Sequence, residues 1–190
     1  MELGTAVAGA WSSGISVYAV AAILGIGGRL DWVDSPDFLQ RPWVIAVALL
    51  LLAVELVVDK ISYLDSAWDS VHTFIRPVAG ALLLDASDAS AGTVLLVGSG
   101  ATLALLAHGA KSSTRLLVNV SPEPASNVLV SLAEDGLVAV LMTLALTAPE
   151  VALAFTVVLA TLSAIVVILV VRTGRRVLAR RRRSRDTRDT

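Results

Sequence analysis

Long apolar stretches alternate with short polar segments along almost the whole chain. The last stretch runs without a charge from Val151 to Val171, and a helix needs about 20 such residues to cross the hydrocarbon core of a bilayer. The connections are rich in aspartate, serine and proline, which favour turns. The pattern therefore predicts an all-α membrane protein with six transmembrane helices, over residues 6–28, 42–60, 70–86, 91–113, 125–147 and 150–172.

Two of these stretches allow more than one interpretation. No basic residue precedes the apolar stretch 6–28 and no clear cleavage site ends it, so we expect a retained helix rather than a signal peptide. The stretch 70–86 is short and contains Arg76 and Pro77. We expect it to span the membrane fully, and the alternative is a re-entrant segment.

The composition agrees with a membrane protein. Of the 190 residues, 56% are hydrophobic and only 16% are charged, whereas soluble domains average about 25% charged residues. Nine arginines lie in the last nineteen positions, which leaves six basic against fourteen acidic residues in the rest of the chain. Such a basic tail is typical of a cytoplasmic end, and we expect it to contact anionic lipid headgroups rather than nucleic acid.

The Lys/Arg bias predicts the side on which each loop lies. Lys60, Lys111 and Arg115 border the second and fourth loops, which we therefore expect in the cytoplasm with the tail. The first loop, expected outside, is a mild exception because it carries Arg29 and Arg41. Six spans with a cytoplasmic C-terminus also place the N-terminus in the cytoplasm. The other loops expected outside carry only acidic charges, Asp85, Asp88 and Glu150.

A shift of 86 residues aligns the two halves of the chain without a gap. Three helices in each half would give the halves opposite orientations, as in many secondary transporters. We predict such a 3+3 inverted repeat, with halves 6–86 and 91–172 in a transmembrane domain 1–173, followed by a basic tail 174–190 that is disordered at its end. A parallel duplication, or no repeat, is the alternative. The aligned pairs include Ser13-Gly14 with Ser99-Gly100, Arg29-Leu30 with Arg115-Leu116, and Ser35-Pro36 with Ser121-Pro122.

Ionisable residues inside the apolar stretches are the candidate functional residues. A charge at the bilayer centre costs about 2.5–3.5 kcal/mol on insertion scales unless it is paired or faces water. Residues four apart lie on one helix face, as Glu55 and Asp59 do, and as His72 and Arg76 do. The candidates for substrate binding, ion binding or coupling are Glu55, Asp59, His72, Arg76, His108, Lys111, Glu134 and Asp135.

Some of these residues also have a purely structural interpretation. Near a helix end, Glu55 or Lys111 could simply extend to the membrane interface. Arg76, Glu134 and Asp135 lie a turn or more inside their stretches, so a functional role is favoured for them, with packing salt bridges as the alternative. The two histidines could titrate near neutral pH, which suits proton coupling.

Small residues in the first and fourth stretches give a second indication. Gly14, Gly98, Gly100 and Gly109 belong to segments that the repeat makes equivalent. They allow either close helix packing or a locally unwound backbone. Two helices could therefore cross near the centre of the protein.

Several function classes lack their motifs. The chain has no cysteine, so disulfides and thiolate metal sites are excluded. It also has no HExxH, no nucleophile elbow, no Walker loop and no Rossmann glycine pattern. We therefore expect neither an enzyme nor a bound cofactor.

Four sequence blocks together have a recognisable pattern. They are Glu55-Leu-Val-Val-Asp59-Lys60, Asp65-Ser-Ala-Trp68-Asp69, His72-Thr-Phe-Ile-Arg76-Pro77, and Asn119-Val-Ser121-Pro122 through Ser131-Leu-Ala-Glu134-Asp135. These blocks resemble the DUF4126 family of bacterial integral membrane proteins. The resemblance extends from Gly14 to Pro149 and implies a multi-pass protein of the bacterial inner membrane, without implying a substrate. The family often has Gly-Leu-Asn-Pro-Tyr in its first segment, where this chain has Gly14-Ile-Ser-Val-Tyr18, so it lacks that proline.

The sequence as a whole predicts passage of a small ion or solute, by a transporter or a channel, with proton coupling as one form. The carboxylates would bind or couple, with Arg76 and the histidines as counter-charges. An anionic substrate held by Arg76, Lys111 and His108 is equally open. The alternative is a non-transporting membrane scaffold whose buried charges set helix packing, and an intramembrane enzyme ranks below both. A small six-helix unit also suggests a homo-oligomer.

Overall fold

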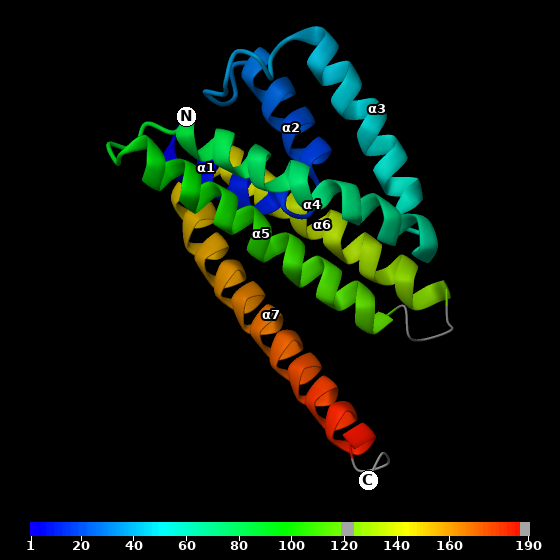
Figure 1. Ribbon diagram of the computed structural model, residues 1–190. Helices are drawn as coiled ribbons and strands as arrows, with labels where there is room; N and C mark the ends of the chain where they lie inside the picture. Colours follow the sequence, from blue (N-terminus) through cyan, green and yellow to red (C-terminus); the bar gives the residue numbers. More distant parts are fainter. Residues whose placement is uncertain (119–123, 187–190) are drawn as a thin grey trace.

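A computed structural model describes residues 1–118 and 124–186 as helices joined by short loops (Figure 1). Within these residues, three helical segments are long and apolar enough to cross a membrane by length and composition: 93–116, 125–147 and 149–176. This architecture agrees with the expected all-α membrane protein. The helices of the described part are α1 (Leu3–Ser13), α2 (Val17–Arg29), α3 (Pro42–Val58), α4 (Ser62–Asp85), α5 (Thr93–Val118), α6 (Pro124–Thr147) and α7 (Pro149–Asp186).

The expectation of one continuous helix over residues 6–28 is wrong, because the helix breaks between α1 and α2. Ser16 adopts an extended conformation and its hydroxyl accepts a hydrogen bond from the Ala19 backbone N–H at 3.2 Å. This is the N-cap interaction that begins a new helix. Gly14 supplies the space, since a Cβ there would lie 2.2 Å from the Ala104 carbonyl oxygen of α5.

After the break, α2 turns back toward the end of the bundle from which α1 came. The Met1 amino nitrogen lies 2.6 Å from Asp34 Oδ2, in the loop after α2, and 3.1 Å from Asp88 Oδ2, in the loop after α4. Burial lowers the pKa of this amino group, but its hydrogen bonds to the two aspartates outweigh burial, so its pKa is raised. We call this the N-terminal end of the bundle; α1 and α2 form a hairpin that enters and leaves there.

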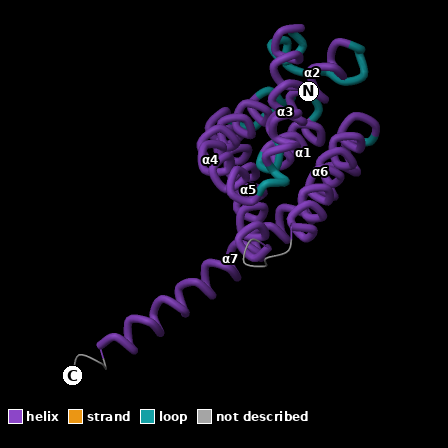
Figure 2. The backbone as a smooth tube through the Cα atoms, turned by 90° about the vertical axis from the view of Figure 1, so that its right-hand side faces the viewer, coloured by secondary structure: helices purple, strands orange, loops and turns teal. Residues whose placement is uncertain are grey.

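The remaining helices alternate in direction between the N-terminal end and the opposite end, which we call the tail end. Helices α3, α5 and α7 run toward the tail end, and α4 and α6 run back (Figure 1). Because the hairpin does not cross, Met1 and the last turns of α7 lie at opposite ends (Figure 2). The stretch 6–28, expected to cross as one helix, is thus a hairpin of two shorter helices.

Two other boundaries differ from the sequence prediction. α4 begins at Ser62 instead of near residue 70 and has 24 residues, which corresponds to a length of about 36 Å. The segment 70–86 is therefore the C-terminal part of a longer helix, which is not among the three segments found apolar enough to cross a membrane. α7 continues into the basic tail as far as Asp186, and the expected disorder at the tail's end concerns residues 187–190, which lie outside the described part.

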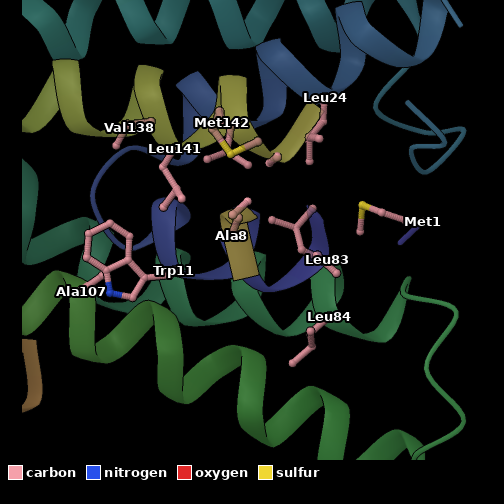
Figure 3. Close-up of a cluster of buried hydrophobic side chains, with 14 of the residues drawn as sticks. Met1, Ala8, Trp11, Leu24, Leu83, Leu84, Ala107, Val138, Leu141 and Met142 are labelled. Atoms are coloured by element: carbon pink, nitrogen blue, oxygen red, sulfur yellow. The ribbon is translucent and has the colours of Figure 1, made fainter. Parts of the chain in front are cut away.

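α1 lies at the centre of the fold. Nine of its 11 residues are buried, and it contacts α4, α5, α6 and α7. Small side chains along α1 let these helices approach closely. Trp11 of α1 belongs to the apolar core together with Leu83, Leu141 and Met142 from the surrounding helices (Figure 3). The core therefore fills the half of the bundle next to the N-terminal end.

α4 and α5 make the most extensive helix contact in the fold. At their crossing the backbones touch, since a Cβ on Gly100 would lie 2.2 Å from the Gly80 carbonyl oxygen and a Cβ on Gly80 would lie 2.5 Å from the Gly100 oxygen. Neither helix can move away without separating the polar residues that follow along the pair. Glycine at these two positions is therefore required by the packing.

Replacement of these glycines tests the crossing. We expect Gly100→Ala to lower the free energy of unfolding by about 1–3 kcal/mol, because the added methyl group forces α4 and α5 apart. Gly98→Ala on the same helix is the matched control, since a Cβ there meets no heavy atom within 4 Å. Thermal unfolding of the detergent-purified protein measures both. Equal stability of the two variants would contradict the close crossing.

Candidate functional site

Ionisable residues gather where α3, α4, α5 and α6 meet beside the α1–α2 break. Arg76 is completely buried, at 0% exposure. A buried charge is costly unless a partner and hydrogen bonds compensate it, so the pairing of each group is informative. We define the charge cluster as Glu55, Asp59, Asp65, Asp69, Arg76, His108, Lys111, Arg115 and Glu134.

Arg76, from the middle of α4, connects three helices. Its Nη2 lies 3.3 Å from Glu55 Oε1 of α3, and its Nη1 lies 3.0 Å from Asp69 Oδ1, two turns earlier on α4. The same Nη1 donates a hydrogen bond to Nδ1 of His108 on α5. One guanidinium thus satisfies two carboxylates and an imidazole, using the several fixed donors that only arginine offers.

The hydrogen bonds of His108 determine its protonation state. A guanidinium can only donate, so Nδ1 accepts and Nε2 carries the ring proton. Nε2 lies 2.8 Å from Thr73 Oγ1, and the Thr73 hydroxyl donates to the Asp69 carbonyl oxygen at 2.9 Å. His108 is therefore neutral in this arrangement and contributes no positive charge to the cluster.

His72 is held in the opposite tautomer by a different set of neighbours. Its Nδ1 lies 2.8 Å from the Trp68 carbonyl oxygen and donates to it, and in the neutral ring Nε2 accepts from the Tyr18 hydroxyl at 2.8 Å. The ring stacks on Trp68, with centroids 4.6 Å apart. Tyr18 belongs to the first turn of α2, so this contact fastens the hairpin to α4.

Asp59, at the C-terminal cap of α3, is the centre of a second group. Its Oδ2 lies 2.7 Å from Lys111 Nζ and 3.6 Å from Arg115 Nη2, both on α5. Its backbone carbonyl accepts from Arg115 Nη1 at 2.8 Å. Arg115 also donates to Glu134 Oε2 of α6 at 2.7 Å and to the Asn127 side chain at 2.8 Å. The second group therefore joins α3, α5 and α6.

The break of the hairpin meets both groups. The Ser16 hydroxyl donates a short hydrogen bond to Glu55 Oε2, and Lys111 Nζ lies 3.3 Å from the Ile15 carbonyl oxygen. The C-terminal end of a helix carries partial negative charge, which favours a cation such as Lys111 beside the end of α1. Residues of the broken backbone are thus ligands of the cluster.

The charges of the cluster do not balance. It contains three cations, Arg76, Lys111 and Arg115, while its histidine, His108, is neutral by its hydrogen bonds. The carboxylates outnumber these cations by two. The carboxylates are Glu55, Asp59, Asp65, Asp69 and Glu134.

Six of the eight residues proposed from the sequence belong to this cluster, and His72 and Asp135 lie beside it. Asp135 forms none of the ion pairs found among the described residues, and its Oδ2 lacks a hydrogen-bond partner there. Lys60, at the end of α3, donates to the Leu56 carbonyl oxygen at 2.6 Å, as expected for a residue at the interface. Within the described part, no group of three or more His or acidic residues could hold a metal ion.

The sequence analysis missed Asp65 and Asp69 as site residues. Together with His72 and Arg76 they recur at intervals of four, three and four residues, which places all four on one face of α4. This periodicity was available in the sequence. It could not be recognised as one helix face, because the expected helix began near residue 70 and so left out both aspartates.

Comparisons with known proteins give a family and no function. A model of the family described as "Domain of unknown function (DUF4126)" matches residues 3–170. No curated protein matches the chain, and no solved structure matches it.

Two lysines, one paired within the cluster and one at the interface, test how far the cluster stabilises the fold. We expect Lys111→Met to lower the free energy of unfolding by about 3–5 kcal/mol, because Asp59 is left buried without its closest cation. Lys60→Met is the control and should change stability by less than about 1 kcal/mol. Unfolding in detergent measures both. If adding Asp59→Asn to Lys111→Met recovers no stability, the pairing is not the cause.

Proposed function

We propose that this chain, which belongs to the DUF4126 family, is a protein of the bacterial inner membrane that moves a small ion or solute through the charge cluster, as a transporter or a channel. One observation carries the proposal: the α1–α2 hairpin ends its two half-helices at the cluster. Discontinuous helices that end at a substrate or ion site are typical of secondary transporters.

The position of the break favours function over simple packing. Non-helical backbone at membrane depth is tolerated only where it is buried in protein or lines a cavity. Here Gly14, Ile15 and Ser16 are all buried, and two of them contact charged groups of the cluster. A helix interruption at this depth places backbone carbonyl and hydroxyl groups where they can exchange partners with a passing ion or polar solute.

The directions of the helices support an inverted repeat. The shift of 86 residues pairs α2 with α5, α3 with α6 and α4 with α7, and the members of each pair run in opposite directions (Figure 1). α1 is the exception, since it runs parallel to the first turns of α5. We therefore propose two inverted halves with five complete spans and one re-entrant hairpin.

The charges at the two ends suggest an orientation. Lys60 and the arginine-rich end of α7 lie at the tail end, so we propose that this end faces the cytoplasm, where the arginines contact anionic lipid headgroups. The N-terminal end then faces outward. Its loops carry mainly acidic residues: Asp31, Asp34, Asp37, Asp85 and Asp88.

A membrane scaffold is the second candidate function. It is favoured by the burial of Arg76, Lys111 and Arg115, each of which pairs with at least two carboxylates. Charges that serve only to specify helix packing would be arranged in the same way. In that case the chain would act by binding lipid, a partner protein or a second copy. Neither candidate function includes an enzymatic activity.

Flux through reconstituted liposomes tests transport directly. With a panel of ion-sensitive and pH-sensitive dyes, wild-type protein should give flux that Glu55→Gln lowers by about tenfold or more, a barrier change of about 1.4 kcal/mol. The amide keeps the size of the side chain while removing its charge. Glu150→Gln, an exposed carboxylate in the first turn of α7, is the control. No flux from well-folded wild-type protein across the panel would favour the scaffold.

The cysteine-free chain allows a direct test of the topology. We expect Glu2→Cys and Ser90→Cys to react with a membrane-impermeant maleimide added to whole cells, because both lie at the N-terminal end. Thr173→Cys should react only after permeabilisation. Labelling of Glu2→Cys and Thr173→Cys from the same side would contradict the re-entrant hairpin.

A further inference from the structure

We propose that Asp65 carries a proton in the resting protein and exchanges it with water at the tail end. This inference rests on the proposed function, which it deepens by naming the proton as the coupling ion. The starting point is the surplus of two carboxylates over cations in the charge cluster. A buried surplus of negative charge is unfavourable in a low dielectric, so protons or other cations must compensate it.

Asp65 has the weakest pairing of the cluster carboxylates. Its nearest cationic atom, Arg115 Nη1, is 3.7 Å from Oδ2, whereas the other four carboxylates have one within 3.3 Å. Its Oδ1, like those of Asp59 and Asp69, has no hydrogen-bond partner among the described residues. Its side chain is nevertheless only 1% exposed. By comparison, Asp59 and Glu134 each have a cationic nitrogen at 2.7 Å. Asp65 is therefore the carboxylate that gains most by becoming neutral.

The groups around Asp65 add to this tendency. Negative neighbours on two sides disfavour a further ionised carboxylate, whereas the two cations are engaged more closely elsewhere. The charged residues that act on Asp65 are Asp59 from the end of α3, Asp69 on α4, and Lys111 and Arg115 from α5. Glu134 of α6 is the closer partner of Arg115, at 2.7 Å.

A cavity lined mainly by polar residues lies beside Asp65 and brings water close to its buried carboxyl group. It lies between α4 and α5, has a volume of about 250 Å³, and is lined by Asp65, Asp69, Thr73, Ser112 and Arg115, among others. This volume holds several water molecules, and the hydroxyl and carboxyl groups offer the partners that such waters need. The cavity lies in the tail-end half of the pair, because Asp65 is in the first turn of α4.

A proton fits this place better than a metal ion does. Arg115 is beside Asp65 and repels a cation, whereas a neutral carboxylic acid needs no further charge compensation. No set of three metal-ligating side chains occurs among the residues that the structure describes. The opposing argument is that the first turn of a helix favours a negative charge, so an ionised Asp65 stabilised by the α4 N-terminus is the alternative outcome.

Infrared difference spectroscopy of the purified protein, titrated with pH, distinguishes the two states. A protonated buried carboxyl group gives a C=O stretching band that a carboxylate lacks. We expect this band in wild-type protein at neutral pH and expect Asp65→Asn to remove it. Asp85→Asn, an exposed carboxylate at the other end of α4, should leave the band unchanged. A wild-type spectrum without the band, or a band that survives Asp65→Asn, would overturn the proposal.

Two further measurements keep the test decisive. Asp65→Glu retains a carboxylic acid, so the band should persist at a shifted frequency; its loss would contradict protonation at this position. If Asp65→Asn does not fold, the Asp65→Glu spectrum still shows whether residue 65 carries a proton. Flux assays are separate: a band without any flux supports the proton site and removes transport, whereas flux without the band retains transport and removes the proton site.

Discussion

The structure depends on the pairing of buried charges around Asp59. The carboxylate of this residue neutralises Lys111, and its backbone carbonyl accepts from Arg115. Both cations lie on α5, and Arg115 continues to Glu134 on α6. Since an unpaired charge in a low dielectric costs several kcal/mol, α3, α5 and α6 cannot separate without a large penalty. The end of α3, which otherwise has few contacts with α4, is thereby fixed in place.

The hairpin divides the bundle into an apolar half and a polar half. Near the N-terminal end, Trp11 of α1 forms an apolar core with residues such as Leu83 and Met142 (Figure 3). α1 then stops at Ser13, where the polar half begins with Ser16 and its carboxylate partner, Glu55. A continuous helix would have carried apolar side chains into the charge cluster. The break lets the chain fill one half and supply polar backbone groups to the other.

Much of this could be predicted from hydropathy and spacing. The bounds of α3 and α6 agree closely with the apolar stretches, and the requirement that intramembrane charges be paired identified most of the charge cluster. The hairpin could not be predicted in the same way, because residues 6–28 carry no charge and a turn back leaves little trace in hydropathy. Gly14 was compatible with both close packing and an unwound backbone, and the choice between the two depended on the neighbouring α5.

Asp65 and Asp135 show the limits of inference from depth along a helix. Both are acidic residues in or near apolar stretches, yet Asp65 belongs to the charge cluster and Asp135 does not. Glu134 is adjacent to Asp135 in the sequence, and successive helical positions point about 100° apart. Of the two, only Glu134 forms a direct ion pair with Arg115 among the described residues. Which of them does so is set by the rotation of α6 against α5, a tertiary property that the local sequence does not encode.

The contacts of the charge cluster form a continuous path from the cavity to the break. Asp65 faces Arg115, Arg115 and Lys111 share Asp59, and Lys111 reaches the Ile15 carbonyl oxygen at the end of α1. A change of charge at Asp65 alters the attraction that Arg115 divides among its partners. This change strengthens or weakens the ion pair between Asp59 and Lys111. The contact of Lys111 with the Ile15 carbonyl oxygen, and with it the position of the broken backbone, depends on that ion pair. Coupling of this kind requires an element with two arrangements, and a half-helix hairpin fastened by a few polar contacts is the element in this fold best suited to supply them.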